Sequence, residues 1–189
     1  MFIVVGLVGV LIISSPTIGA FFRFTGEEQF SEFWLSDSNN LSEKFPFNIQ
    51  TGEENRLFLG VGNHLGNSAY YLIDVKFRNQ TQPLPNSTSS KPSSLISIHE
   101  FQFILADGDV WETPVNFKIL DTSIQDNSMV VENILVNDNI FQVDCPATWD
   151  PENNGFYFQL FFELSLYNSE KSTFQFQNQF IGVWLNITG

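Results

Sequence analysis

The chain has 189 residues, enough for one domain of ordinary size with its own core. Hydrophobic residues make up 43% of it, charged residues only 15%, and 21 residues are phenylalanine, a composition that excludes an intrinsically disordered chain and favours a packed, strand-rich fold. The formal net charge of -13 argues against a nucleic-acid partner and against docking of the domain on an anionic lipid surface.

The first 24 residues predict a membrane anchor. No charged side chain occurs from Met1 to Phe22, and about 20 helical residues are needed to cross the hydrocarbon core. The positively charged start of a secretory signal peptide is missing, so we expect an uncleaved signal-anchor helix over residues 1–24. A signal peptide cleaved after Gly19 and Ala20 is one alternative. A pilin-like helix in a filament core is another.

Residues 26–189 are expected to form one domain that faces the cell exterior, with the protein crossing the cell membrane once. Long domains translocate largely regardless of the charges that flank the anchor. The domain contains four N-x-S/T sequons, which are candidate glycosylation sites: Asn40, Asn79, Asn86 and Asn186. Composition alone would produce most of these, so they permit glycosylation without establishing it.

Alternation of apolar and polar residues with period two dominates after residue 28. In chain order, the runs expected as strands are 30–35, 57–61, 69–77, 98–105, 115–120, two weak runs within 128–144, 155–167 and 172–187. About seven to nine short strands at this spacing predict an all-β fold, an antiparallel immunoglobulin-like β-sandwich. Residues 80–95 are rich in Pro, Ser, Thr and Asn, which predicts a long exposed loop within the domain.

The last two strands carry the candidate interface. One face of the run 155–167 is an apolar stripe that suits the core, and the other face carries several aromatic residues. The aromatic residues expected on the outer side of this strand pair are Tyr157, Phe161, Tyr167, Phe180 and Trp184. An exposed aromatic group of this size usually marks an interface. Alternatively, the 80–95 loop or residues 123–150 fold over these side chains and make them ordinary core.

Two glycine-containing stretches resemble ligand-binding loops without matching them. The run from Gly60 to Gly66 has its third glycine one place too late for a dinucleotide loop, and a strand follows it, so a hairpin turn is the favoured interpretation. The run from Asp150 to Gly155 resembles a calcium loop, but Phe161 stands where a bidentate carboxylate is needed. A tight turn that enters the next strand is favoured there too.

The remaining candidates for chemistry are few. His64 and His99 are the only histidines and Cys145 is the only cysteine, so no intramolecular disulfide is possible. We expect Cys145 to be buried, His64 to lie in a turn and His99 at the edge of the core. Carboxylate pairs such as Asp107 and Asp109 matter only if a cleft brings them together. We therefore predict no catalytic residue, no cofactor and no metal site.

An ordered set of short motifs resembles one protein family. The motifs are Phe30-Ser-Glu-Phe-Trp-Leu35, Gly52-Glu-Glu54, Leu59-Gly-Val-Gly-Asn-His64, Ala106-Asp-Gly-Asp-Val-Trp-Glu112 with Pro114 and Phe117, and Phe180-Ile-Gly-Val-Trp-Leu185. Together they resemble the C-terminal domain of an archaeal membrane-protein family known as domain of unknown function sixteen-sixteen (DUF1616), over roughly residues 26–188.

The resemblance implies an extracytoplasmic sandwich, similar to immunoglobulin-like or adhesion modules, that is attached to membrane-spanning segments. It implies no activity and no catalytic residues. This chain departs from the commonest pattern in two ways, because it has one hydrophobic segment and because residues 123–150 resemble an insertion.

The sequence thus favours a non-catalytic, membrane-anchored cell-surface glycoprotein module that binds proteins or glycans or assembles with copies of itself. An accessory subunit of a membrane protein complex and a pilin-like filament subunit are the alternatives. A hydrolase of envelope polymers is a more distant class.

Overall fold

The computed structural model describes residues 29–37 and 45–188, and these parts of the chain are all-β. They form ten strands: β1 (Phe30–Ser36), β2 (Asn48–Gln50), β3 (Asn55–His64), β4 (Ala69–Asn79), β5 (His99–Leu105), β6 (Val110–Gln125), β7 (Ser128–Val136), β8 (Asn139–Thr148), β9 (Tyr157–Asn168) and β10 (Thr173–Thr188). Within the same ranges, no helix has the length and apolar character that a membrane crossing requires. The anchor predicted over residues 1–24 lies outside them.

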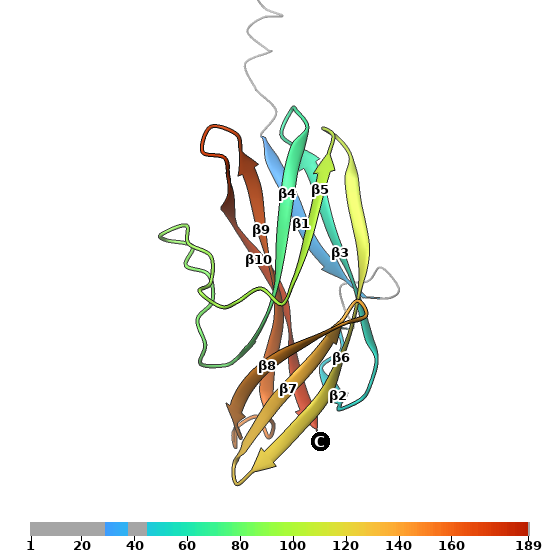
Figure 1. The fold of residues 1–189 in the computed structure, drawn as a ribbon, viewed down its shortest axis with the longest axis vertical. Coiled ribbons are helices and arrows are strands. Elements are labelled where there is room, and N and C mark those ends of the chain that lie inside the picture. The colour runs from blue at the N-terminus through green and yellow to red at the C-terminus, as the bar shows by residue number, and fades with distance from the viewer. Residues whose placement is uncertain (1–28, 38–44, 189) are drawn as a thin grey trace, which may run out of the picture. The chain divides into compact units, whose positions relative to one another are not determined.

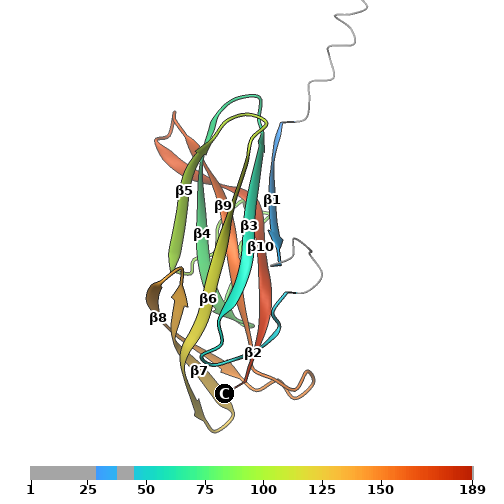
Figure 2. The same ribbon diagram turned by 90° about the vertical axis from the view of Figure 1, so that its right-hand side faces the viewer.

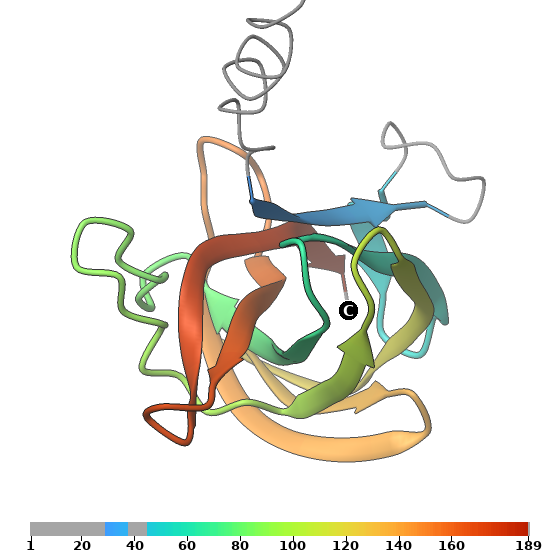
Figure 3. The ribbon, with the colours of Figure 1, turned by 90° about the horizontal axis from the view of Figure 1, so that it is seen from above.

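The strands build two five-stranded sheets (Figure 1). Sheet A has the order β1-β3-β6-β7-β8, and sheet B has the order β2-β10-β9-β4-β5. The pairs β9–β10, β4–β9 and β4–β5 are antiparallel, whereas the short β2 lies parallel to the end of β10. Seen from above, the strands of both sheets surround a common interior (Figure 3). The 80–98 segment between β4 and β5 projects to one side of them.

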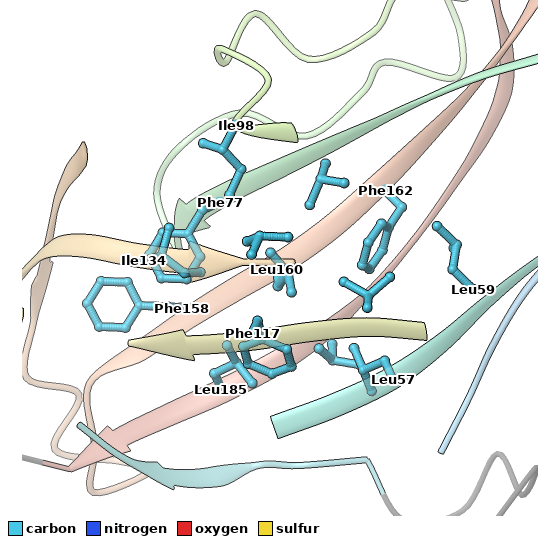
Figure 4. Close-up of a cluster of buried hydrophobic side chains, with 14 of the residues drawn as sticks. Leu57, Leu59, Phe77, Ile98, Phe117, Ile134, Phe158, Leu160, Phe162 and Leu185 are labelled. Carbon is cyan, nitrogen blue, oxygen red and sulfur yellow. The ribbon is translucent and has the colours of Figure 1, made fainter. Parts of the chain in front are cut away.

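The hydrophobic core lies between the sheets and draws side chains from both (Figure 4). Sheet A contributes Leu57, Leu59 and Phe117, and sheet B contributes Phe158 and Phe162, all with no exposed surface. The alternation found in the sequence is confirmed, because the inward residues of β4 and the apolar stripe of β9 are buried as expected: Tyr71, Ile73, Val75, Phe158, Leu160, Phe162 and Leu164.

Most of residues 123–150, the segment that the sequence suggests is an insertion, form strands of sheet A. The strand β6 runs from the upper to the lower part of sheet A (Figure 2). Its first half pairs with β3 and its second half with β7, and β7 pairs with β8. Met129, Val131, Ile134 and Val136 of β7 have no exposed surface. The two weak runs predicted within residues 128–144 are thus confirmed as the strands β7 and β8, and their inward side chains complete the core.

The glycines of β3 serve close packing between strands. The prediction of a hairpin turn over Gly60–Gly66 is wrong for its first part, because β3 continues to His64 and the turn begins after it. A Cβ on Gly60 would lie 2.1 Å from Cε2 of Trp34, so the indole of β1 lies against the bare backbone at Gly60. A Cβ on Gly62 would lie 3.0 Å from the carboxylate of Glu32. Gly60 and Gly62 thus make room for the side chains of β1.

Substitution of Gly60 by alanine tests this packing. The added methyl must displace the Trp34 indole, and overpacking of this kind typically destabilises by about 1–3 kcal/mol. Chemical denaturation of Gly60→Ala should show a loss in that range. Gly62→Ala is the matched control, because its nearest neighbour is the mobile end of Glu32, and it should lose clearly less. Equal losses for the two variants would show that Trp34 does not depend on Gly60.

Candidate functional site

The outer face of sheet B holds the side chains that differ most from an ordinary solvated sheet surface. Residues Tyr157 to Ser165 of β9 are all buried, so this strand is covered on both of its faces. On the outer face, successive rows pair Trp184 with Gln159 and Arg78, then Gly182 with Phe161 and Lys76, then Phe180 with Glu163 and Asp74. The face therefore carries aromatic, charged and amide side chains in adjacent rows.

A buried ion pair occupies the middle of this face. Lys76 is 5% exposed and Glu163 is fully buried, and Nζ of Lys76 lies 2.7 Å from Oε2 of Glu163. Lys76 Nζ also donates to the carbonyl of Ser93 (2.9 Å), and the Ser93 backbone N–H donates to Glu163 Oε1 (2.7 Å). Removing two ions from water costs several kcal/mol each, and only close pairing with further hydrogen bonds offsets this cost. These three residues satisfy that requirement together.

Ser93 belongs to residues 80–98, which we call the cover loop. This loop leaves β4, projects from the side of the sheets and returns to β5 (Figure 1). Ser93 Oγ donates to the carbonyl of Pro83, which ties the two arms of the loop together. Asn178, at an irregularity of β10, donates to Ser90 Oγ. Residues 80–95 were predicted to be an exposed loop, and most of them are exposed, but Pro85 and Ser93 are buried.

The cover loop borders an open cleft on the same face. The cleft has a volume of about 530 Å³, and Asp74, Lys76 and Ser165 lie among the residues that line it. Ser90 and Pro92 line it from the cover loop. Small-molecule pockets have similar volumes but are mostly apolar and enclosed, whereas this cleft is open and mixes charged and polar side chains with apolar ones.

A second, smaller hollow lies at the lower end of the face, and we call it the Trp184 hollow. It has a volume of about 220 Å³ and is lined by Phe47, Gln80, Asn153, Tyr157 and Trp184. Trp184 is 39% exposed, and Phe47 is also exposed, with its ring 6.0 Å from that of Tyr157. Two open aromatic rings and two amide side chains thus surround a space of the size of one ring.

Arg78 holds Trp184 in position through one face of its ring. Its Cζ lies 5.4 Å from the centroid of the Trp184 ring, within cation–π range. Its guanidinium donates to Gln159 Oε1 and to the carbonyl of Gln80, both at 2.8 Å. Burial lowers the pKa of Arg78, but a guanidinium remains protonated at neutral pH. Trp184 therefore has a fixed positive charge on one ring face.

A third group of aromatic residues lies at the upper end of the face, and we call it the upper cluster. Tyr70, Tyr167 and Phe174 contact one another with centroid distances of 4.9 to 5.7 Å. Beside them, on β5, Ile104 is 73% exposed. Such an exposed isoleucine next to an aromatic group adds to the apolar surface of this end.

The predicted interface residues differ widely in exposure. Phe161 and Tyr157 are buried, which corrects the expectation that they are exposed. Phe161 lies in the row between Lys76 and Gly182, which is part of the face that the cover loop reaches. Phe180 is half-buried, while Tyr167 and Trp184 are more than a third exposed. The single predicted aromatic surface is therefore two exposed ends separated by a covered middle.

Some members of the site were not predicted from the sequence. Phe47 stands alone before the short β2, and Glu163 lies in the middle of an aromatic strand, so neither gave a pattern. One signal did exist: Lys76 and Arg78 are two of only 8 basic residues, and they occur two apart on the outer face of a strand. Lysine and arginine are almost never buried without a partner, so once this face is known to be covered, acidic or aromatic partners are expected beside them.

The histidines and the cysteine lie on three different strands and form no catalytic arrangement with one another. His64 lies at the end of β3 with Nε2 3.6 Å from Glu32 Oε2. His99 packs edge-on against Phe101 at the core's edge, as predicted, and its burial lowers its pKa, so it is neutral at pH 7. Cys145 is buried, as predicted, and burial raises the pKa of its thiol to about 11.

The carboxylates of Asp150 and Asp107 accept hydrogen bonds from backbone N–H groups of turns. Asp150 Oδ1 accepts from the backbone N–H groups of Glu152 and Asn153, and Asp150 pairs with Gly155 across the turn. The side chain of Asn153 also donates to Asp150 Oδ2. This bond, followed by those from the backbone, lowers the pKa of Asp150. The prediction of a tight turn is confirmed. Asp107 accepts from the backbone N–H of Gly66 and so links the turn between β5 and β6 to the turn between β3 and β4.

Three of the four sequons lie in the described residues. Asn79 and Asn186 are buried, while Asn86 is exposed on the cover loop. Asn40 lies outside the described ranges.

Breaking the buried ion pair should destabilise the domain strongly. Lys76→Met leaves Glu163 buried without its cation, a change that costs about 3–5 kcal/mol in comparable sites. Denaturant unfolding should therefore show a loss of this size for Lys76→Met. The control Lys91→Met, on the exposed part of the cover loop, should lose less than about 0.5 kcal/mol.

The double variant Lys76→Met/Glu163→Leu separates charge burial from simple packing. An apolar pair often replaces a buried ion pair at little cost, so the double variant should be more stable than Lys76→Met alone. Recovery should be incomplete, because the Ser93 N–H loses its acceptor. Additive losses in the double variant would contradict the pairing.

Two of the solved structures that resemble the chain are distant from it in sequence. A beta-glucosidase from Listeria innocua in complex with gluconolactone is 12% identical, with a TM-score of 0.38 over 85% of this chain. This chain spans 16% of the length of that protein. A chain of the complex between Zinc 2-glycoprotein and Prolactin inducible protein from human seminal plasma is 8% identical, with a TM-score of 0.39 over 87% of this chain and 99% of that one. At these TM-scores neither likeness bears on function.

Comparison of sequences gives a clearer result. No curated protein matches the chain. The family model described as Domain of unknown function (DUF1616) matches residues 25–154, which is more than half of the chain and runs from just before β1 into the turn before β9. The resemblance noted in the sequence motifs is thereby confirmed, and the chain belongs to the DUF1616 family.

Proposed function

We propose that the protein is a non-catalytic, membrane-anchored cell-surface module that binds a neutral glycan in the Trp184 hollow. In this proposal residues 1–24 form the single membrane-spanning anchor, and the two sheets form an immunoglobulin-like β-sandwich on the outside of the cell. The uncharged stretch from Met1 to Phe22 supports the anchor. The common core of the two sheets supports the sandwich.

The observation that carries the proposal is the exposed indole of Trp184 in a hollow with Phe47 and Tyr157. The apolar C–H face of a pyranose ring stacks on aromatic rings, while its hydroxyls need hydrogen-bonding partners at the rim. Gln80 and Asn153 supply amide groups at that rim. At about 220 Å³ the hollow is smaller than the roughly 300–1,000 Å³ of pockets for drug-sized molecules, so it suits one ring of a longer chain.

Electrostatics favours a neutral ligand. The net charge of -13 repels anionic polymers such as nucleic acids and acidic polysaccharides. The one cation beside the hollow, among the residues that the structure describes, is Arg78, which is only 4% exposed and donates to Gln159 and to the carbonyl of Gln80. Arg78 thus positions Trp184 and is not open to pair with a carboxylate or sulfate of the ligand.

A binding screen against immobilised neutral glycans tests the proposal, with the full chain in detergent micelles. Truncation of a central tryptophan typically costs at least about 2 kcal/mol, or roughly thirtyfold in affinity. Trp184→Ala should therefore weaken binding at least tenfold. Tyr167→Ala is the matched control, because Tyr167 lies on the same face with nearly equal exposure but in the upper cluster. It should bind like the wild type.

Two results would defeat the glycan proposal. One is the absence of binding to any neutral glycan, and the other is unchanged binding by Trp184→Ala. Thermal melts of both variants must accompany the screen, because loss of the Arg78–Trp184 contact removes about 0.5–1 kcal/mol of stability.

Assembly with copies of the chain or with another subunit is the second candidate function. The upper cluster favours it, because Ile104 is 73% exposed beside three aromatic rings. Apolar patches of this kind often mark contacts between proteins. The oligomeric state of Ile104→Ser, measured by light scattering in detergent, distinguishes this candidate: a smaller particle than the wild type supports assembly through the upper cluster, and an unchanged particle contradicts it.

A further inference from the structure

The described sequons differ in whether their asparagine amide is available to an enzyme. In N-glycosylation the Nδ2 atom of the asparagine becomes bonded to a sugar, so this atom must reach solvent in the folded product. Asn79 does not meet this condition. It is buried at the end of β4, and its Nδ2 donates to the carbonyl of Pro146 on β8. Its Oδ1 accepts from the backbone N–H groups of Thr81 and Gln82.

Asn186 does not meet the condition either. Its side chain is buried in β10, and Nδ2 donates to Asn48 Oδ1 (2.9 Å). A Cβ on Gly155 would come within 2.1 Å of Asn186 Oδ1, so the side chain lies directly on the backbone of Gly155. A glycan on either Asn79 or Asn186 would have to displace part of the fold.

Asn86 has the opposite environment. It is exposed on the cover loop, where a backbone pairing with Lys91 closes a short turn. Its Oδ1 accepts from the N–H groups of Thr88 (3.0 Å) and Ser89 (3.1 Å), which holds the side chain in one orientation. No hydrogen bond from its Nδ2 occurs within the described parts of the chain. The Asn86 amide is thus exposed to solvent and held in one orientation.

We propose that Asn86 carries an N-linked glycan and that Asn79 and Asn186 do not. The inference rests on the proposed placement of the domain outside the cell. A lipid-linked glycosyl phosphate is the donor: a bond forms between Asn86 Nδ2 and C1 of the first sugar, and the bond from C1 to the phosphate oxygen breaks. Nδ2 loses one proton, and the lipid phosphate leaves with the bonding electron pair. No oxidant or reductant takes part.

The modification agrees with the polar character of the cover loop. Residues 86–91 contain no large apolar side chain and are exposed throughout. The buried residues of the loop are Pro85, Ser93 and Ile98, all outside residues 86–91, so a glycan on Asn86 leaves the Lys76–Glu163 pair undisturbed. A glycosylated chain therefore keeps the fold described above.

Peptide mass spectrometry of the full chain, isolated from the membranes of its own cells, tests the proposal. The peptide with Asn86 should carry the mass of a glycan, and the peptides with Asn79 and Asn186 should not. Thr88→Ala destroys the sequon without touching Asn86 and should abolish the added mass. Thr88→Ser is the matched control, because it preserves the sequon, and it should retain the added mass.

An unmodified Asn86 in the wild type, or a glycan on Asn79 or Asn186, would overturn the inference. Protease accessibility of the domain in intact cells, measured on the same samples, separates the two proposals. Cleavage from outside together with an unmodified Asn86 refutes the glycosylation alone. Protection of the domain together with an unmodified Asn86 refutes the exterior placement as well.

Discussion

The buried ion pair between Lys76 and Glu163 sets the organisation of the whole outer face of sheet B. A lysine and a glutamate can remain charged inside a protein only if each finds close partners. Here the third partner is the backbone of Ser93, which offers a carbonyl to Lys76 and an N–H to Glu163. These two bonds form only when Ser93 lies against the sheet. The buried charges of Lys76 and Glu163 therefore hold the cover loop in place.

This attachment divides one sheet face into parts with different properties. The middle, around Phe161, is buried, and the cover loop bonds there to Lys76 and Glu163. The ends stay open and keep their aromatic side chains in contact with solvent, at Trp184 below and at Tyr167 above. A glycan stacked on Trp184 and a neighbouring protein on the upper cluster could therefore bind the same module without competing for one surface. The cover loop also carries Asn86 on an exposed turn.

Much of the fold follows from local pattern. Strands such as β4 and β9 alternate cleanly, so their inward residues were predicted correctly, and so were the turn at Asp150 and the burial of Cys145. Local alternation gave the wrong environment where a residue is covered or contacted by a segment that is distant in the sequence. Alternation places Phe161 on the outer side, but the loop that covers this face begins about 80 residues earlier. Gly60 and Gly62 suggested a turn, yet their role is set by Trp34 and Glu32 of another strand.

Hydrogen exchange at the Ser93 amide tests most directly whether the buried pair holds the cover loop on the sheet. This N–H donates to the fully buried Glu163, so its exchange should require an opening of nearly the same free energy as that of the β9 amides. Ser94, the next residue along, is exposed and provides the comparison in the same peptide. Slow exchange at Ser93 beside fast exchange at Ser94 is the predicted result. Equally fast exchange at both would show that the loop leaves the sheet freely and that the ion pair does not organise this face.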